Sequence, residues 1–248
     1  MSRDDSFLTV DVGDMLKHTV VVRHRLEEQY RDLEHQTSTA VLGMWLFLAT
    51  EVMFFGTIFL ALAIYRYQYP EACEAASVRL KWQIAAANTV VLLVSSFTMV
   101  LGVHYSKLAR RRPLVICLLL TAALGLTFLV LKGWEYFLDY EEYLIPGWRF
   151  RAGDWIEKSG LSSGQVPHVE LFLLFYWIMT AIHALHMIIG ITAVLILSVL
   201  AARGHFADGY YAPVDVVGLY WHFVDMVWIF LLPMLYLLGT HSLAGASG

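Results

Sequence analysis

Five long apolar stretches limit what this chain can fold into. They cover approximately residues 40–65, 82–105, 114–138, 169–200 and 216–238. A helix of about 20 residues crosses the hydrocarbon core of a bilayer, whereas buried strands are much shorter and half-buried strands alternate in polarity. The chain is 58% hydrophobic and 15% charged, while soluble domains contain about 25% charged residues. The sequence therefore predicts an all-α integral membrane protein with five transmembrane helices in a bundle.

Polar residues flank this predicted bundle at both ends. We expect residues 1–38 to form a polar N-terminal arm, residues 39–241 the five-helix transmembrane domain, and residues 242–248 a short C-terminal tail. The arm lacks the apolar run of a signal peptide. Its segment 14–36 fits a helix on the membrane surface and a solvated tail equally well. Lys and Arg are concentrated on the N-terminal side of the membrane, most densely in the turn 107–112, which predicts a cytoplasmic N-terminus and an external C-terminus.

Charge, cysteines and a proline add smaller constraints. The formal net charge of −4 provides no basic surface for nucleic acid. We expect Cys73 in a polar loop and Cys117 near the start of the third apolar stretch, at different depths and therefore unpaired. Pro233 lies within the fifth stretch, where it should kink the helix unless a neighbouring group replaces the lost hydrogen bond.

Polar and ionisable side chains interrupt the apolar stretches. A carboxylate at the centre of a membrane helix costs at least about 2.5 kcal/mol, and Glu51 is at such a position. His183 and His186 share one helix face, as do His222 and Asp225, because each pair is three residues apart. The full set at the interior or rims of the helices is Glu51, Asn88, His104, Lys132, Glu135, His183, His186, His222 and Asp225. Lys132 is one turn from Glu135 and can pair with it.

Three interpretations of this set compete. A single metal or haem site is disfavoured because His222 and Glu135 lie near opposite membrane borders, roughly 15–20 Å apart at about 1.5 Å per residue, although Glu51, His183 and His186 could still converge. Polar groups at several heights could form a proton or substrate pathway, but the internal repeats typical of transporters are not evident. The groups could also hold helices together and anchor lipid or another subunit. The aromatic face around Trp221 and Trp228 fits either packing or docking of a subunit.

Five motifs, one in each stretch, carry a resemblance to a known family. They are Leu-Phe-Leu-Ala-Thr-Glu-Val-Met-Phe-Phe-Gly at 46–56, Asn-Thr-Val-Val-Leu-Leu-Val-Ser-Ser at 88–96, Gly-Trp-Glu-Tyr at 133–136, the paired-histidine segment 180–190, and Tyr-Trp-His-Phe-Val-Asp-Met-Val-Trp-Ile-Phe at 220–230. In this order they resemble subunit III of the haem-copper respiratory oxidases, in its five-helix bacterial form. Seven-helix members carry two further helices before the glutamate motif, where this chain has its polar arm, and many relatives have Gln at the position of Lys132.

The resemblance implies a function. The chain would be the non-catalytic subunit III of a proton-pumping terminal oxidase that passes electrons from cytochrome c to oxygen, and it would stabilise subunit I, bind lipid and support proton uptake. A quinol oxidase subunit III and a nitric oxide reductase accessory subunit are alternatives of the same fold. A free-standing proton-coupled transporter is an alternative of another class. The implied partners are oxidase subunits I and II, which would carry the haem and copper, and membrane lipids of the bacterial inner membrane.

The resemblance also assigns candidate residues by position. It implies no catalytic residue, no metal ligand and no cofactor bound by this chain. The groups implied to be buried and related to proton movement are Glu51, Glu135 and Asp225. The groups implied to contact the bundle, lipid or subunit I are Asn88, His183, His186, Trp221, His222 and Trp228.

Overall fold

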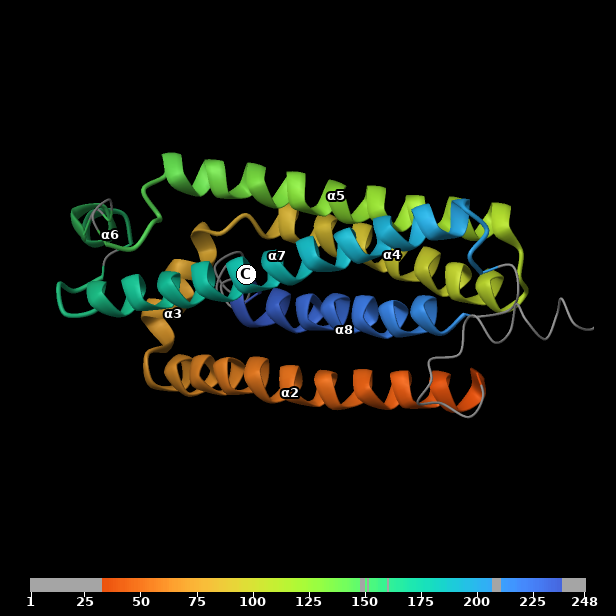
Figure 1. The fold of residues 1–248 in the computed structure, drawn as a ribbon. Helices are drawn as coiled ribbons and strands as arrows, with labels where there is room; N and C mark the ends of the chain where they lie inside the picture. The colour runs from red at the N-terminus through yellow and green to blue at the C-terminus, as the bar shows by residue number, and fades with distance from the viewer. Residues whose placement is uncertain (1–32, 148–149, 151, 160, 207–210, 238–248) are drawn as a thin grey trace, which may run out of the picture.

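The computed structural model describes residues 33–147, 150, 152–159, 161–206 and 211–237, and this part of the chain is helical with no strands. Its helices are α2 (Leu33–Gln68), α3 (Pro70–Arg79), α4 (Trp82–Lys107), α5 (Arg111–Glu141), α6 (Ala152–Ser159), α7 (Val166–Ala202) and α8 (Ala212–Leu235) (Figure 1). Five of them, α2, α4, α5, α7 and α8, are long and apolar enough to cross a membrane. The predicted all-helical fold with five spans is confirmed.

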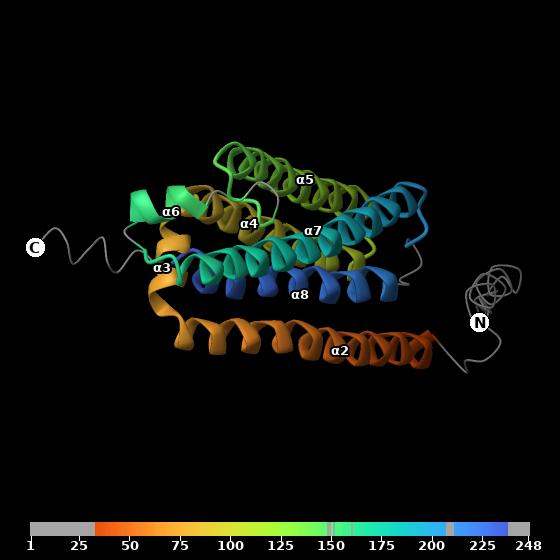
Figure 2. The ribbon, with the colours of Figure 1, turned by 90° about the vertical axis from the view of Figure 1, so that its left-hand side faces the viewer.

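Four of the long helices form a closed core, and the fifth lies at its edge. Helix α4 packs on α5 and α8, and α7 packs on the same two helices, so the four enclose one interior. Helix α2 packs chiefly on α8, and both views show it apart from the remaining long helices (Figures 1 and 2). Only 17% of the apolar window of α2 is buried within the chain, against 33–44% in the other four spans. Most of α2 is therefore available to lipid or to another protein.

Interior positions of the four-helix core recur every seven residues, which is the repeat of helices that pack with a left-handed supercoil. On these four helices the repeated buried positions carry glycine, polar and aromatic residues as well as aliphatic ones. These positions are Gly125, Lys132 and Asp139 on α5, Tyr176, His183 and Gly190 on α7, Asn88 and Ser95 on α4, and Trp221 and Trp228 on α8. Several polar side chains of the sequence, such as Asn88, Lys132 and His183, therefore line the core in layers.

The short helix α3 is the main departure from the prediction. The expectation of a polar loop around Cys73 is wrong, because Pro70 begins a helix there and Ala72, Cys73 and Ala76 form its buried side. Proline is common at the first helical position, where no backbone N–H is required. Both cysteines are unpaired, as expected. Helix α3 links α2 to the start of α7, where Tyr69 stacks on His168 with ring centroids 3.7 Å apart.

Several helix ends also differ from those expected. Helix α2 begins at Leu33, earlier than residue 40, and α5 continues to Glu141, past residue 138. The longer α5 places Asp139 inside the helix and fully buried. Helix α8 ends at Leu235, two residues after Pro233, so this proline lies in the last turn of the helix and not within its central part. Helix α6 lies in the connection between α5 and α7. The arm up to residue 32 and the tail 242–248 lie outside the described residues.

Candidate functional site

Trp221 fixes one layer of the core. Its indole Nε1 donates to the Ser95 hydroxyl at 3.1 Å, and its ring lies against two glycines of neighbouring helices. A Cβ at Gly125 would lie 2.8 Å from Trp221 Cη2, and one at Gly190 would lie 3.2 Å from the ring. Real Cβ atoms do not approach that closely, so a residue without a side chain is needed at Gly125. Small residues at these positions allow the helix backbones to approach around the indole.

Trp228 fixes the next layer, seven residues later. It is fully buried and donates from Nε1 to the Thr89 hydroxyl at 3.1 Å. Its ring meets Phe128 edge to face, with centroids 4.8 Å apart, and lies 5.1 Å from the ring of His183. Trp221 and Trp228 therefore both contact the interior of this chain. They do not form an outward docking face.

His222 and Asp225 interact with another helix. His222 Nδ1 lies 2.7 Å from the hydroxyl of Ser96 on α4. Asp225 is 3% exposed, lies beside Ser96, and neither carboxyl oxygen makes a hydrogen bond of regular geometry. The polar atoms of Asn88 and both ring nitrogens of His183 are likewise buried without a hydrogen bond among the described residues. Of the other histidines in the set, His104 lies exposed at the end of α4.

Glu51 and His186 meet where α2 approaches α7. Glu51 Oε2 lies 3.3 Å from His186 Nε2, although it is not aligned for a hydrogen bond. His186 Nδ1 lies 2.9 Å from the carbonyl oxygen of Ile182. Because a carbonyl only accepts, Nδ1 must carry a proton. The contact therefore places Nε2, which can accept or carry a proton, beside a carboxyl oxygen that can do the same.

A second polar group lies at the end of the core, and we call it the Lys132 cluster: Lys132, Glu135, Asp139, Tyr176 and Tyr236. Lys132 Nζ donates to Glu135 Oε1 at 3.0 Å and to the Tyr236 hydroxyl at 2.6 Å. The Tyr236 hydroxyl lies 2.6 Å from Glu135 Oε1, and the Tyr176 hydroxyl lies 2.7 Å from Asp139 Oδ2. The predicted pairing of Lys132 with Glu135 is therefore present, within a network that joins α5 to α7 and to the residue that follows α8.

Aromatic rings enclose the ammonium group of this cluster. Lys132 Nζ lies 4.9–5.3 Å from the ring centroids of Tyr136, Tyr176, Trp228 and Tyr236. Ring faces attract cations, most strongly where water is excluded, and the Lys132 side chain is only 2% exposed. The rings and the carboxyl groups together offset the cost of burying the charge.

Sequence reasoning missed three members of the cluster. Asp139 was expected beyond the end of its helix, and Tyr176 and Tyr236 were not singled out. Two spacings could have revealed part of the set, because Asp139 is seven residues after Lys132 and Tyr176 is seven residues before His183. Equal heptad positions on packed helices face the same interior.

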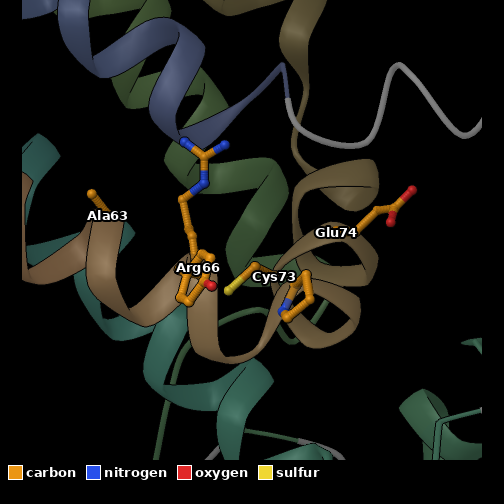
Figure 3. Close-up of a pocket in the computed structure, with 6 residues that line it drawn as sticks. Ala63, Arg66, Cys73 and Glu74 are labelled. Atoms are coloured by element: carbon orange, nitrogen blue, oxygen red, sulfur yellow. The ribbon is translucent and has the colours of Figure 1, made fainter.

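A shallow hollow lies outside the core, at the junction of α2 and α3. It has a volume of about 330 Å³ and is lined by Ala63, Arg66, Tyr67, Pro70, Cys73 and Glu74. Figure 3 shows Arg66 extending toward α8, where its Nη1 lies 3.4 Å from the carbonyl oxygen of Met234, while Glu74 points away from it. Burial raises the pKa of the Cys73 thiol to about 11, with Arg66 acting in the opposite direction. The thiol is therefore a packing group and a poor nucleophile.

The polar groups do not converge on one point. In the described part of the chain, no three His, Cys, Asp or Glu side chains gather as the ligands of one metal ion would. The arrangement instead provides two groups that can hold a proton, the Glu51–His186 pair and the Lys132 cluster. It also provides hydrogen bonds that hold the core helices in register.

Comparison with known proteins shows which family the chain resembles. The sequence profile of cytochrome c oxidase subunit III matches residues 170–240. A probable quinol oxidase subunit 3 from Staphylococcus haemolyticus is 28% identical over 207 residues, which are 83% of this chain and 92% of the relative. The proteins of the same description from Staphylococcus epidermidis and Staphylococcus aureus are each 27% identical with the same coverage. The chain thus has five helices long and apolar enough to span a membrane, and its sequence is similar to cytochrome c oxidase subunit III over residues 170–240 and to proteins described as quinol oxidase subunit 3 over most of its length.

Proposed function

We propose that this chain is the non-catalytic subunit III of a proton-pumping, oxygen-reducing terminal oxidase in a bacterial inner membrane. It packs beside subunit I, contacts subunit II and membrane lipids, and supports proton uptake. Haem and copper are bound by the partner subunits, and this chain supplies no redox centre. The N-terminus faces the cytoplasm and the C-terminus the outside, which follows from the distribution of Lys and Arg along the sequence.

One observation carries the proposal. The family profile matches residues 170–240, which contain most of α7 and all of α8. Most of the candidate residues fall within this segment, namely His183, His186, Trp221, His222, Asp225 and Trp228. The part of the sequence most like the family thus also supplies α7 and α8, two of the four core helices.

The proton role rests on Glu51 and His186. The side chains are 18% and 14% exposed, respectively, so the pair lies at the boundary between the core and α2. A carboxyl group in an apolar bundle is costly and usually marks a proton or ion function. Because the pair brings two proton-binding atoms together and remains partly accessible, it can bind and release a proton without opening the core.

The subunit contacts rest on α2. Its outward side carries large apolar side chains, among them Leu46, Met53 and Leu60, which are each more than 60% exposed. Such a face must be covered by lipid or by another membrane helix. In the proposed complex, lipid and subunit I cover it.

Purification of the complex tests the proposal. A tagged chain extracted in mild detergent should co-elute with a haem-copper subunit, and the sample should consume oxygen and show a haem spectrum. The isolated chain should show no haem absorbance. A monodisperse chain that moves protons or solute in liposomes without partners would contradict the proposal and support the transporter alternative.

The electron donor is a separate question, because its binding site lies on other subunits. The matching profile is named for cytochrome c oxidase, whereas the relatives are named quinol oxidase subunits. Oxygen consumption by the purified complex with reduced cytochrome c, and then with quinol, distinguishes the two. Reduction of nitric oxide without reduction of oxygen would instead identify the accessory subunit of a nitric oxide reductase.

A further inference from the structure

The Lys132 cluster contains more acidic groups than basic ones. It has two carboxyl groups, Glu135 and Asp139, and one ammonium group on Lys132. Lys132 is 2% exposed and the two carboxyl side chains are fully buried. If both carboxyl groups were ionised, a net negative charge would lie in an apolar bundle. Burying an uncompensated charge costs several kcal/mol even after relaxation, so the cluster needs one more positive charge or one more proton.

In the part of the chain that the structure describes, the neighbouring charged groups do not provide that positive charge. On α5, Glu142 adds negative charge near Asp139 and pairs with Lys81. Arg79 of α3 lies over the Trp155 ring and donates to the Asp154 carbonyl oxygen. Of the other packed helices, α7 contributes Tyr176 and His183 and α8 leads to Tyr236, and Asn88 of α4 is uncharged. Among the described residues, the electrostatic partners of Asp139 include no cation besides Lys132.

Glu135 and Asp139 differ in the number of hydrogen bonds that their carboxyl groups accept. Glu135 Oε1 accepts from Lys132 Nζ at 3.0 Å and from the Tyr236 hydroxyl at 2.6 Å, as an ionised group would. Asp139 is contacted by the Tyr176 hydroxyl alone, 2.7 Å from Oδ2, and this hydroxyl also lies 3.0 Å from Glu135 Oε1. Asp139 Oδ1 and Glu135 Oε2 both lack a hydrogen-bond partner among the described residues, so the two carboxyl groups differ in the number of donors on their other oxygen. An ionised carboxylate can accept about four hydrogen bonds, so Asp139 is the poorly solvated member.

We propose that the Lys132 cluster is a binding site for one proton, which is held by Asp139 while Glu135 forms the ion pair with Lys132. The site differs from the Glu51–His186 pair. Tyr176 and His186 are ten residues apart on α7, and a rise of about 1.5 Å per residue separates their levels by roughly 15 Å. The proposal does not depend on the oxidase function, because it follows from the charges and contacts of this chain.

Infrared spectroscopy of the purified complex in detergent tests the proposal. A protonated carboxyl group has a C=O stretching band, shifted in D₂O, that a carboxylate lacks. Since one ammonium group supports one carboxylate, Asp139→Asn and Glu135→Gln should each abolish the band of the cluster. In Glu135→Gln, Asp139 becomes the carboxylate that pairs with Lys132, so Asp139 loses its proton and its band disappears. Lys132→Met should double the band, because both carboxyl groups then remain protonated.

Two substitutions outside the cluster test whether the band belongs to the cluster. Asp225→Asn should leave the cluster band in place, and exposed Glu142→Gln should change nothing in this region of the spectrum. The two carboxamide variants keep the charge balance and are expected to assemble. If Lys132→Met does not accumulate, Lys132→Gln replaces it with the same expectation. A band that survives Glu135→Gln, or a wild-type protein with no cluster band, would overturn the proposal. If the band appears only when sodium and potassium are replaced by choline, a bound metal cation supplies the missing positive charge in place of the proton. That result would also overturn the proposal.

Discussion

The Lys132 cluster and the Glu51–His186 pair differ in how deeply they are buried and in how many hydrogen bonds the chain itself provides to them. The Lys132 cluster is at most 2% exposed and connects three elements through hydrogen bonds from two tyrosines. The Glu51–His186 pair is more exposed, lies beside the loosely packed α2, and has a single contact between its members.

The difference indicates separate roles for groups of similar chemistry. A cluster enclosed by the core can hold charge and fix the helices, but its exchange with water requires the core to open. A pair at the boundary of the chain stabilises the fold little and remains available to lipid, water or a partner. We therefore expect substitutions in the core to change stability, and substitutions at the boundary to change function.

The largest loss of stability is expected from Lys132→Met. Removing one partner of a buried ion pair costs about 3–5 kcal/mol, here because Glu135 must take up a proton to remain buried. That extra proton is bound in the folded state and released on unfolding at neutral pH, so the stability deficit should shrink as pH falls. Thermal unfolding in detergent at several pH values measures this. A variant as stable as the wild type would show that the cluster contributes nothing to the core.

A smaller loss is expected from Gly125→Ala. The added Cβ would lie 2.8 Å from the Trp221 ring and 3.0 Å from Ile191 Cγ1, and overpacking of this kind costs about 1–3 kcal/mol. Gly56 of α2 is the matched control, because nothing lies within 4 Å of a Cβ built there. Gly56→Ala should leave the melting temperature unchanged or raise it slightly. Equal losses of stability in both variants would contradict the conclusion that the core is closely packed and α2 is not.

His222→Leu should lower stability by about 1 kcal/mol, since it removes one hydrogen bond to Ser96. The ring is only half-buried, so we also expect weaker association with the other subunits. The measurement is recovery of the complex during purification in mild detergent. Ser96→Ala removes the same bond but keeps the ring, and should retain association. Identical recovery of His222→Leu and wild type would restrict His222 to a role within the chain.

The fold was predictable because a helix that crosses a lipid bilayer needs an apolar segment of about 20 residues. Apolar length alone located the five spans, and the spacing of Lys132 and Glu135 predicted their pairing. The missing members of the cluster could not be found in this way, because Tyr236 and Asp139 are 101 and 37 residues from their respective hydrogen-bond partners, Glu135 and Tyr176. Tyrosines near helix ends also resemble the aromatic belts at membrane borders. Helix α3 was missed because its buried side consists mainly of small residues, which give a weak apolar pattern.

Glu51 lies at the boundary of the chain and is only partly buried, so we expect its substitution to change stability least and function most. The central claim is that the Glu51–His186 pair carries a proton for the complex while the core supports the fold. The most direct test compares proton uptake and the lifetime of turnover in the purified complex containing Glu51→Gln with those of the wild type. We expect normal assembly and melting temperature together with slower proton uptake or earlier loss of turnover. Wild-type values for both functional measurements would contradict the account.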